Sequence, residues 1–382
     1  PRPQGTGFRK NRPRRFVPLI ECLDAEGRVC GHAAFLFLED ESKTGEDGGM
    51  VASMPVEDRA FFESDAVQHA AAAVAERMLE GLALYEGGAA YYASFGDEVM
   101  PLGATVVNRG AGDRTATVEI RVESAAGNTK YHRRHAIRVA SGRSATVKGE
   151  FRVGTASEAP YTVTVALLSD GQVLDRLAHE IQVWRPPGRP SFVTRNDGNL
   201  LLDGEIWGVH GINYMPSSGI GREDLEPFEY WLDPAPYDPE IIERDLSDIA
   251  RIGFNLVSVF QYRRSMESRN LLDLLIRCRR HGLKVNLSLR PGTPLDFPWE
   301  HVREMIEFAR IAENDTVIAY DLAWEPRWLQ HDRRIPHDEE WGEWIHAQYG
   351  SIEAAERAWE FEAPRNEDGK VTNPLDEHAD GD

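Results

Sequence analysis

The feature that most constrains the fold is a fourfold alternation of strand and helix patterns in the second half of the chain. Short apolar runs predict strands over 207–214, 254–260, 283–289 and 317–324, and amphipathic runs predict helices over 239–253, 268–282, 298–314 and 338–359. Parallel strands need a crossover connection, usually a helix, so this order predicts a parallel sheet with right-handed crossovers. The spacing of about 30 residues between strands is typical of a (β/α)8 barrel, of which this chain would contain half.

A different pattern occupies residues 99–184, where short runs with period-two alternation are separated by turns at 108–110, 126–128 and 169–171. This pattern predicts an antiparallel β-sandwich of the immunoglobulin-like kind. The outward positions carry mostly Arg, Glu and Thr, which favours a structural role for the sandwich over sugar binding, although both remain open. The sequence Arg185-Pro-Pro-Gly-Arg-Pro190 is a stiff linker that ends this region.

Residues 1–95 combine a hairpin pattern over 15–40 with a helix pattern from Ser64 to about Leu84. We therefore expect a multidomain chain with three parts. These are an α+β N-terminal segment over 1–95, which could be the remnant of a larger domain, the β-sandwich over 96–185, and the N-terminal half of a TIM barrel over 186–382.

The charge balance limits the partners. The formal net charge is -20, so nucleic acid and anionic membranes would be repelled. No run approaches the roughly 20 apolar residues of a membrane helix, and no signal peptide is evident, so we expect no membrane partner and leave the compartment and oligomeric state open.

The cysteines argue against a metal site. The chain has three, too few and too scattered for a zinc site or a disulfide framework, and we expect no metal and no cofactor. Cys22 and Cys30 flank a predicted turn at 24–28. They could face each other across two strands, but two reduced, half-buried thiols are the favoured interpretation.

The segment Val317–Trp328 contains the strongest candidate for chemistry. Its apolar strand pattern ends at Glu325, because Pro326 cannot donate to a sheet ladder. Trp324 and Trp328 flank this carboxylate and could form an apolar wall against which a sugar stacks. An acid held at the end of a rigid strand among apolar groups is suited to general acid catalysis.

Three stretches of the second half resemble the catalytic barrels of family-two and family-five glycoside hydrolases. Residues 192–214 resemble the entry into such a barrel, where a short hairpin leads to the motif G-x-N-Y on the first strand. Here that motif is Gly211-Ile-Asn-Tyr214. Residues 244–259 resemble the second unit of the family, and 344–359, with Tyr349-Gly-Ser-Ile-Glu353, are similar to a helix of retaining β-glycosidases.

This resemblance implies a role for Glu325. The family's acid/base glutamate ends the fourth barrel strand, usually within Asn-Glu-Pro, and Glu325 matches that position. Its nucleophile is a glutamate at the end of the seventh strand, which lies outside this chain. Here Trp324 stands where the family usually has Asn, whose amide holds the sugar 2-hydroxyl. The alternative for Glu325 is an ion pair with Arg327 or Arg290.

The other strand ends supply weaker candidates. Tyr214, Gln261 and Arg290 follow the first three expected strands, and we expect them, with Trp324 and Trp328, to bind substrate at the C-terminal mouth. They could instead brace loops. The aromatic loop 215–239, with Phe228, Tyr230, Trp231 and Tyr237, could form a sugar platform or pack against the missing half-barrel. We expect His210 to be a core histidine.

Two functions follow. The main hypothesis is a glycoside hydrolase that cleaves a β-linked oligo- or polysaccharide with retention, using Glu325 as acid/base. The alternative is a catalytically inactive carbohydrate-binding protein on the same barrel, which the unusual Trp324 motivates.

Overall fold

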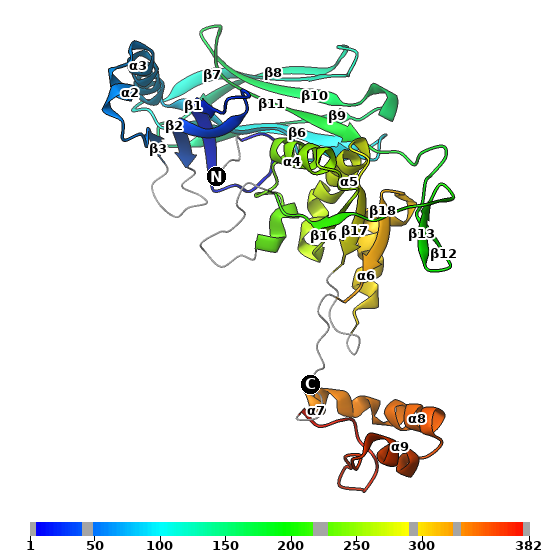
Figure 1. The fold of residues 1–382 in the computed structure, drawn as a ribbon. Coiled ribbons are helices and arrows are strands. Elements are labelled where there is room, and N and C mark those ends of the chain that lie inside the picture. The colour runs from blue at the N-terminus through cyan, green and yellow to red at the C-terminus, as the bar shows by residue number, and fades with distance from the viewer. Residues whose placement is uncertain (1–4, 40–48, 217–227, 290–296, 324–329, 377–382) are drawn as a thin grey trace. The chain divides into compact units, whose positions relative to one another are not determined.

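The computed structural model describes residues 5–39, 49–216, 228–289, 297–323 and 330–376 of the chain. It contains two compact units, one of Pro1–Ser288 with Glu304–Tyr320 and the other of Leu289–Arg303 with Asp321–Asp382. The first unit is rich in β-structure and also carries helices (Figure 1).

A sandwich of two sheets encloses the largest apolar core. One sheet has the order β4 (Leu82–Ala89), β6 (Val99–Asn108) and β9 (Ser144–Arg152), and the other β5 (Ala93–Ser94), β11 (Gln172–Val183), β10 (Tyr161–Ser169), β7 (Arg114–Glu123) and β8 (Thr129–Val139). All pairs are antiparallel except that of β5 with β11. Val118, Ile120 and Val122 alternate inward along β7 with no exposed surface, which is the period-two pattern seen in the sequence.

Three strands of this sandwich lie outside the sequence-based expectation, since β5, like β4, precedes residue 96. β8 has no clear apolar alternation, because Arg133 and His135 occupy the same side of the strand as buried Val139. β4 precedes residue 96 and is buried along its whole length. β4 begins at Leu82, within the range expected for the preceding helix, α3. We expected the helix to reach about Leu84, but it ends at Glu80, because Gly81 at φ 71° takes a left-handed conformation that terminates it.

The N-terminal segment forms a three-stranded antiparallel sheet rather than a lone hairpin. Its strands are β1 (Arg14–Leu23), β2 (Val29–Glu39) and β3 (Met50–Ser53), followed by α2 (Arg59–Glu63) and α3 (Asp65–Glu80). Leu36 and Leu38 of β2 pack with Tyr85 and Val107 of the sandwich in a second apolar cluster.

The linker after the sandwich leads into a small antiparallel sheet of β12 (Thr194–Asn196), β13 (Asn199–Leu202) and β14 (Glu205–Ile206). A four-stranded sheet follows, in which β15 (Gly211–Asn213), β16 (Leu256–Phe260), β17 (Lys284–Ser288) and β18 (Val317–Asp321) lie side by side in chain order. β15, β16 and β17 are parallel.

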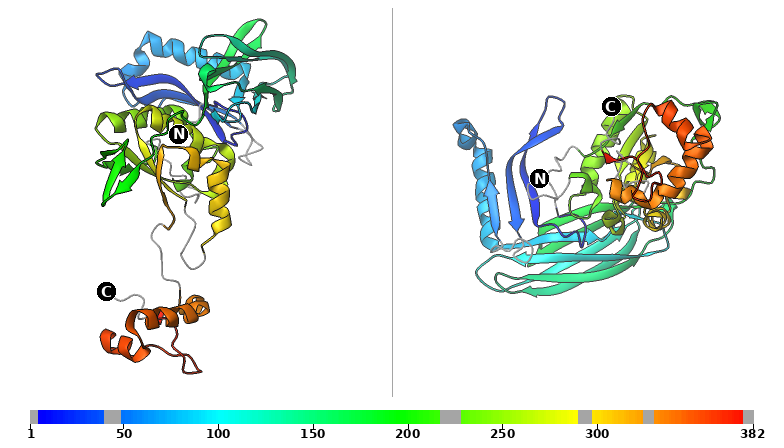
Figure 2. Two further views of the ribbon diagram at one scale, coloured as in Figure 1. Left: turned by 90° about the vertical axis from the view of Figure 1, so that its right-hand side faces the viewer. Right: turned by 90° about the horizontal axis from the view of Figure 1, so that it is seen from below.

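Helices connect these strands, as expected from the alternation. They are α4 (Pro239–Arg251), α5 (Asn270–Arg280) and α6 (Trp299–Phe308). The same connections contain the 3-10 helices η2 (Phe228–Leu232), η3 (Arg263–Ser268) and η5 (Ile311–Glu313), and η1 (Ala156–Glu158) belongs to the sandwich. Asp238 caps α4 by accepting from the backbone N–H of Glu240 and Ile241. α4 and α5 lie between the four-stranded sheet and the sandwich (Figures 1 and 2), where Arg280 of α5 donates to Gln182 of β11 over 3.0 Å.

The second unit contains α7 (His331–Arg334), η6 (Ile335–His337), α8 (Asp338–Tyr349) and α9 (Ile352–Trp359). One helix was expected over 338–359, but two form, since Ser351 caps a new helix by accepting from the N–H of Ala354. Trp341 and Trp359 of the two helices stack with centroids 6.0 Å apart. Among the described residues, no helix is long and apolar enough to cross a membrane.

Candidate active site

The four-stranded sheet has two chemically different faces. Its register aligns Ile212, Val257 and Val285 across three strands, and aligns Asn213, Ser258 and Asn286 in the next row. Side chains alternate between faces along each strand, so these rows lie on opposite sides of the sheet. Val257 and Val285 have no exposed surface. We call their side the helix face and the other the polar face.

Tyr214 belongs to the helix face by this alternation, and its contacts agree. Only 4% of it is exposed, its hydroxyl donates to Oδ2 of Asp245 on α4 over 3.3 Å, and its ring meets Trp231 edge-on at 5.5 Å. Burial and the neighbouring Asp245 carboxylate raise the pKa of this phenol far above its usual range. The tyrosine is therefore placed between the sheet and a helix. Its role in substrate binding stays a prediction.

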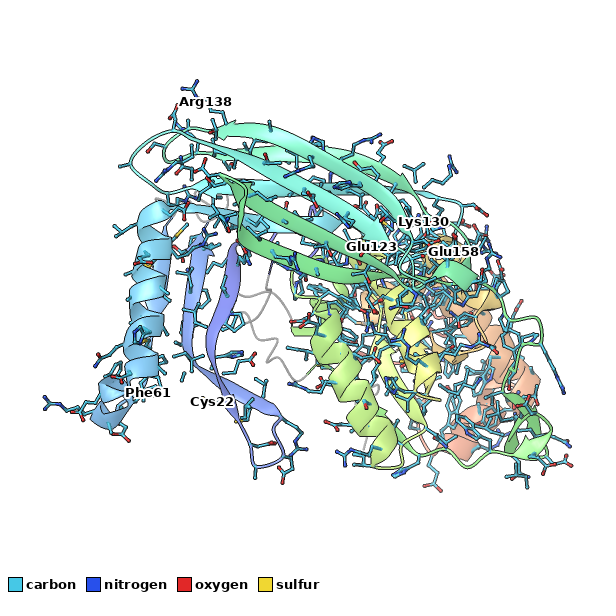
Figure 3. All side chains as sticks on the ribbon, turned by 90° about the horizontal axis from the view of Figure 1, so that it is seen from above. Cys22, Phe61, Glu123, Lys130, Arg138 and Glu158 are labelled. Carbon is cyan, nitrogen blue, oxygen red and sulfur yellow. The ribbon has the colours of Figure 1, made fainter. Side chains whose placement is uncertain are left out.

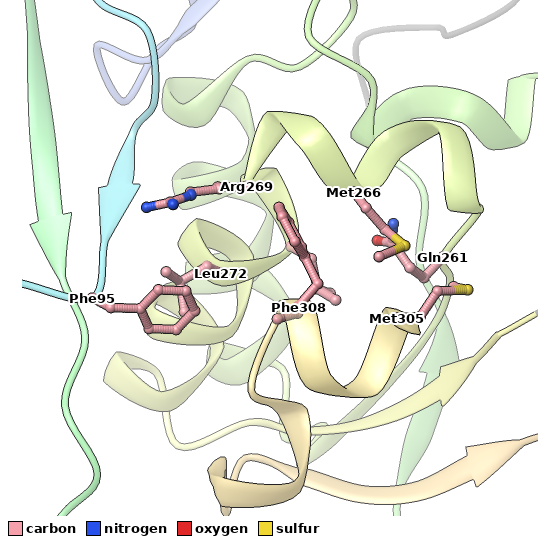
Figure 4. A pocket seen from close by; sticks show the side chains of 9 residues that line it. Phe95, Gln261, Met266, Arg269, Leu272, Met305 and Phe308 are labelled. Carbon is pink, nitrogen blue, oxygen red and sulfur yellow. The ribbon is translucent and has the colours of Figure 1, made fainter. Parts of the chain in front are cut away.

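Gln261 is likewise buried, at 1% exposure. Its Nε2 donates to the carbonyl of Tyr262 over 2.8 Å, whereas its Oε1 has no hydrogen-bond partner within the described part of the chain. The side chain lines a mostly apolar pocket with Met266 and Met305, shown in Figure 4. The pocket's free volume is about 10 Å³, roughly the room for one water molecule and far too little for a sugar ring.

The aromatic loop after β15 is only partly available as a platform. Trp231 and Tyr237 are each 1% exposed and stack on one another at 6.4 Å, so these two residues are core rather than exposed aromatics. Tyr237 also donates to Asp273 of α5 over 2.6 Å. Both rings have further aromatic neighbours, since Trp231 meets Tyr214 edge-on and Tyr237 lies 5.8 Å from Tyr92.

Tyr230 and Tyr262 form a half-buried aromatic pair beyond the ends of β15 and β16. Their rings meet edge-on at 4.5 Å, and the guanidinium of Arg264 lies 4.2 Å from the Tyr230 centroid. Arg264 is in turn paired with Asp233 at 2.6 Å. An aromatic face held by a cation is suited to stacking against the apolar side of a sugar. Of the loop's aromatic residues, Tyr230, together with Tyr262, is thus the one to which the expected role as a sugar platform still applies.

The polar face carries groups that our sequence reasoning did not single out. Asn286 donates to Oγ of Ser258 over 3.1 Å, and exposed Asn213 occupies the same row on β15. Ser288, at the end of β17, is fully buried, and its Oγ has no partner among the described residues. Amide and hydroxyl groups in register can bind sugar hydroxyls. Each of these residues follows an apolar residue directly, as Ser258 follows Val257, so strand alternation would have placed them on the opposite face.

Four of the predicted site residues, Arg290, Trp324, Glu325 and Trp328, lie outside the described residues. β18 ends at Asp321, whose Oδ1 accepts from the N–H of Ala323 over 3.3 Å. The structure therefore places Tyr214 and Gln261 against the helices. The half-buried tyrosine pair and the polar face offer other groups toward the strand ends.

The expectation for His210 was wrong. His210 is exposed rather than a core residue, and its imidazole stacks on Phe254 at 4.2 Å. The strand expected over 207–214 is reduced to Gly211–Asn213, so His210 lies before it instead of within it. In the described part of the chain, no cluster of three or more His, Cys, Asp or Glu residues could hold a metal ion.

Comparisons with known proteins found no matching family model and no matching curated protein. Several solved structures are similar to parts of the chain. A glycosyl hydrolase family 2 member from Bacteroides cellulosilyticus is 16% identical over 70% of this chain and 34% of its own, with a TM-score of 0.28. The β-glucuronidase of Bacteroides uniformis is 16% identical over 75% of this chain and 33% of its own, with a TM-score of 0.30. The β-glucuronidase of Parabacteroides merdae is 13% identical over 70% of this chain and 33% of its own, with a TM-score of 0.26. The chain thus spans about a third of the length of these structures.

Proposed function

We propose that this chain is part of a glycoside hydrolase that cleaves a β-linked oligo- or polysaccharide with retention of configuration. The observation that carries the proposal is the sheet whose four strands lie side by side in chain order. In parallel sheets of this kind, ligands bind at the C-terminal strand ends. β18 ends at Asp321, and Glu325 follows four residues later.

The structural assignments belong to the same proposal. Residues 186–382 are the N-terminal half of a (β/α)8 barrel, 96–185 are an immunoglobulin-like sandwich, and 1–95 are an α+β segment. The order of β15 to β18 supports the first assignment, and the two sheets around one core support the second.

Glu325 acts as the acid/base in this proposal. It protonates the glycosidic oxygen as the bond breaks, and then removes a proton from the water that releases the sugar from a covalent intermediate. The nucleophile that forms this intermediate is a second carboxylate about 5 Å away, contributed by residues outside this chain. The same proposal includes substrate binding by Arg290, Trp324 and Trp328, as expected from the sequence.

Other residues of the chain position the sugar. The Tyr230 and Tyr262 pair offers a stacking surface, which its half-buried aromatic rings support. Asn213, Ser258 and Asn286 form hydrogen bonds with the hydroxyl groups of the sugar. Tyr214 and Gln261, which we predicted to bind substrate directly, are buried on the helix face. In this proposal they support the strand ends from behind the sheet.

The test is Glu325→Gln in the full-length protein. Turnover of substrates with poor leaving groups should fall by about 10²- to 10⁴-fold, because protonation of the leaving group is lost. Activated aryl glycosides should lose much less, and added azide should restore turnover by replacing the water that no longer has a base. Asp321→Asn is the matched control. Equal rates for Glu325→Gln and wild type on all substrates would refute the assignment.

Trp324 supports the second candidate function, a catalytically inactive carbohydrate-binding protein, because it stands where the resembled family has the amide that holds the 2-hydroxyl. Measurable binding of a glycan without any release of sugar, in wild-type full-length protein and across a broad panel, would favour this alternative. Sugar release would exclude it.

A further inference from the structure

The hairpin of β1 and β2 holds two of the three cysteines close to its turn. Cys22 lies near the end of β1, and Cys30 lies near the start of β2. Figure 3 labels Cys22 on the part of this hairpin that leads to the turn. The turn is well ordered by Asp24, which accepts from the N–H groups of Glu26 and Arg28 at 3.0 and 2.8 Å. The turn therefore fixes how the two strands pair on either side of the cysteines.

A β-bulge leaves Cys30 unpaired between Val29 and Gly31, next to the position of Cys22 on the other strand. Cys22 pairs with Gly31 and Leu23 pairs with Val29, so Cys30 is the extra residue on β2. In a bulge of this kind, two successive residues of one strand face a single residue of the other. The thiol of Cys30 reaches across to the opposite strand, where its Sγ lies 3.2 Å from the carbonyl oxygen of Cys22.

The space around the pair is open. A Cβ atom built on Gly31, the residue that pairs with Cys22, would meet no atom within 4 Å. Cys22 and Cys30 are both exposed rather than half-buried as expected, because this hairpin end leaves their side chains uncovered, whereas Cys278 is buried on α5. A rotation about the side-chain bonds of Cys22 or Cys30 is thus not blocked by a neighbour at Gly31, and reagents in solution can reach both residues.

We infer that Cys22 and Cys30 form a dithiol site that is oxidised to an intramolecular disulfide by small-molecule disulfides. One thiolate attacks the disulfide reagent, forms a mixed disulfide and expels one thiolate of the reagent. The second cysteine, as thiolate, attacks the protein sulfur of that mixed disulfide and expels the other thiolate. The protein loses two protons and two electrons, and one molecule of the reagent is reduced to two thiols. The bond joins β1 to β2 beside the turn.

Oxidised glutathione is the probe for this site, used on the full chain at about pH 8, because the thiolate is the attacking species. The intact mass of the native protein should fall by about 2 Da, and a proteolytic digest should contain a peptide pair joined between Cys22 and Cys30. The number of thiols that a thiol reagent labels in the native protein should fall from two to none. Cys278 should remain a thiol that reacts only after unfolding.

Single substitutions separate a dithiol from two independent thiols. Cys22→Ser and Cys30→Ser should each gain one glutathione, about 305 Da, and lose the joined peptide. Cys278→Ser should behave as wild type does. Wild-type protein that carries two glutathione adducts, or that stays fully reduced while either single variant is modified, would overturn the inference, as would a disulfide found only between two molecules.

Discussion

The hydroxyl of Tyr237 donates a 2.6 Å hydrogen bond to Asp273, a carboxylate whose side chain is fully buried on α5. The same carboxylate is paired with Arg277, one turn further along the helix, at 2.8 Å. Arg277 also reaches Glu243 of α4. This buried network joins the loop after β15 to both helices behind the sheet, and so fixes the part of the chain that carries Tyr230.

Removing Asp273 or the hydroxyl of its partner Tyr237 should therefore destabilise the fold. We expect Asp273→Ala to lower the free energy of unfolding by about 3 kcal/mol, because it leaves a buried guanidinium with Glu243 as its remaining carboxylate. Tyr237→Phe should cost about 2 kcal/mol through the lost bond to a charged group. Urea titration of the full chain measures both.

A surface pair on α4 provides the control. Asp248 and Arg251 lie 2.9 Å apart, with side chains 54% and 64% exposed. Asp248→Asn should change the free energy of unfolding by less than about 0.5 kcal/mol. A comparable loss for Asp248→Asn and Asp273→Ala would contradict the importance of the buried network.

Tyrosines on different sides of the sheet should respond differently to substitution. Tyr262→Ala should raise the KM for an oligosaccharide about 3- to 10-fold, since it removes a stacking surface worth about 1 kcal/mol. Tyr214→Phe removes only a buried hydroxyl and its bond to Asp245, and should lower the free energy of unfolding by about 1 kcal/mol with little change in KM. The measurements are steady-state kinetics and denaturation of the full-length protein. A larger KM effect for Tyr214→Phe would restore Tyr214 as a direct substrate ligand.

The stability of the sandwich should depend on pH through His179. This imidazole is buried, its Nε2 accepts from the N–H of Ala89 over 2.8 Å, and burial lowers its pKa from 6.5 to about 3. Between these two values the unfolded chain binds more protons than the folded chain. Stability should therefore rise with pH from about 3 to about 6.5, with a slope of up to about 1.4 kcal/mol per pH unit from this group.

His179→Gln should remove that contribution. Its free energy of unfolding, followed by denaturant titration at several pH values, should show a shallower rise than wild type over this range. Parallel curves for the two proteins would show that His179 titrates alike in the folded and unfolded chains.

Gly81 should tolerate no side chain, because its φ is 71° and a Cβ atom there would lie 2.2 Å from the backbone nitrogen of Gly110. Gly81→Ala should cost about 3 kcal/mol or more, as steric overlap adds to the strain of the left-handed backbone. Gly142 is the matched control, since its φ is 70° and the space around it is open. Gly142→Ala should cost about 1 kcal/mol, and equal losses at both sites would mean that backbone strain alone decides.

Much of the fold could be predicted from local patterns. The strands of the four-stranded sheet, their helices and most strands of the sandwich lie where periodicity placed them. β8 was missed, because Arg133 and His135 interrupt its apolar alternation, and the 207–214 strand was expected to be longer than Gly211–Asn213. The site was less predictable. Alternation from Val257 would have identified Ser258, but nothing local showed that Trp231 is buried.

By itself the sequence determined the order of strands and helices, since a 2.0- or 3.6-residue period is a property of neighbouring residues. It also supplied Glu325, whose assignment remains a proposal. Only the tertiary structure decided which face each side chain joins, because a shift of one residue turns a strand's side chains to the opposite face. Packing against α4 and α5 buries Tyr214 and Gln261 and leaves Asn213 exposed. Contacts between segments far apart in the chain determine which of these side chains are buried.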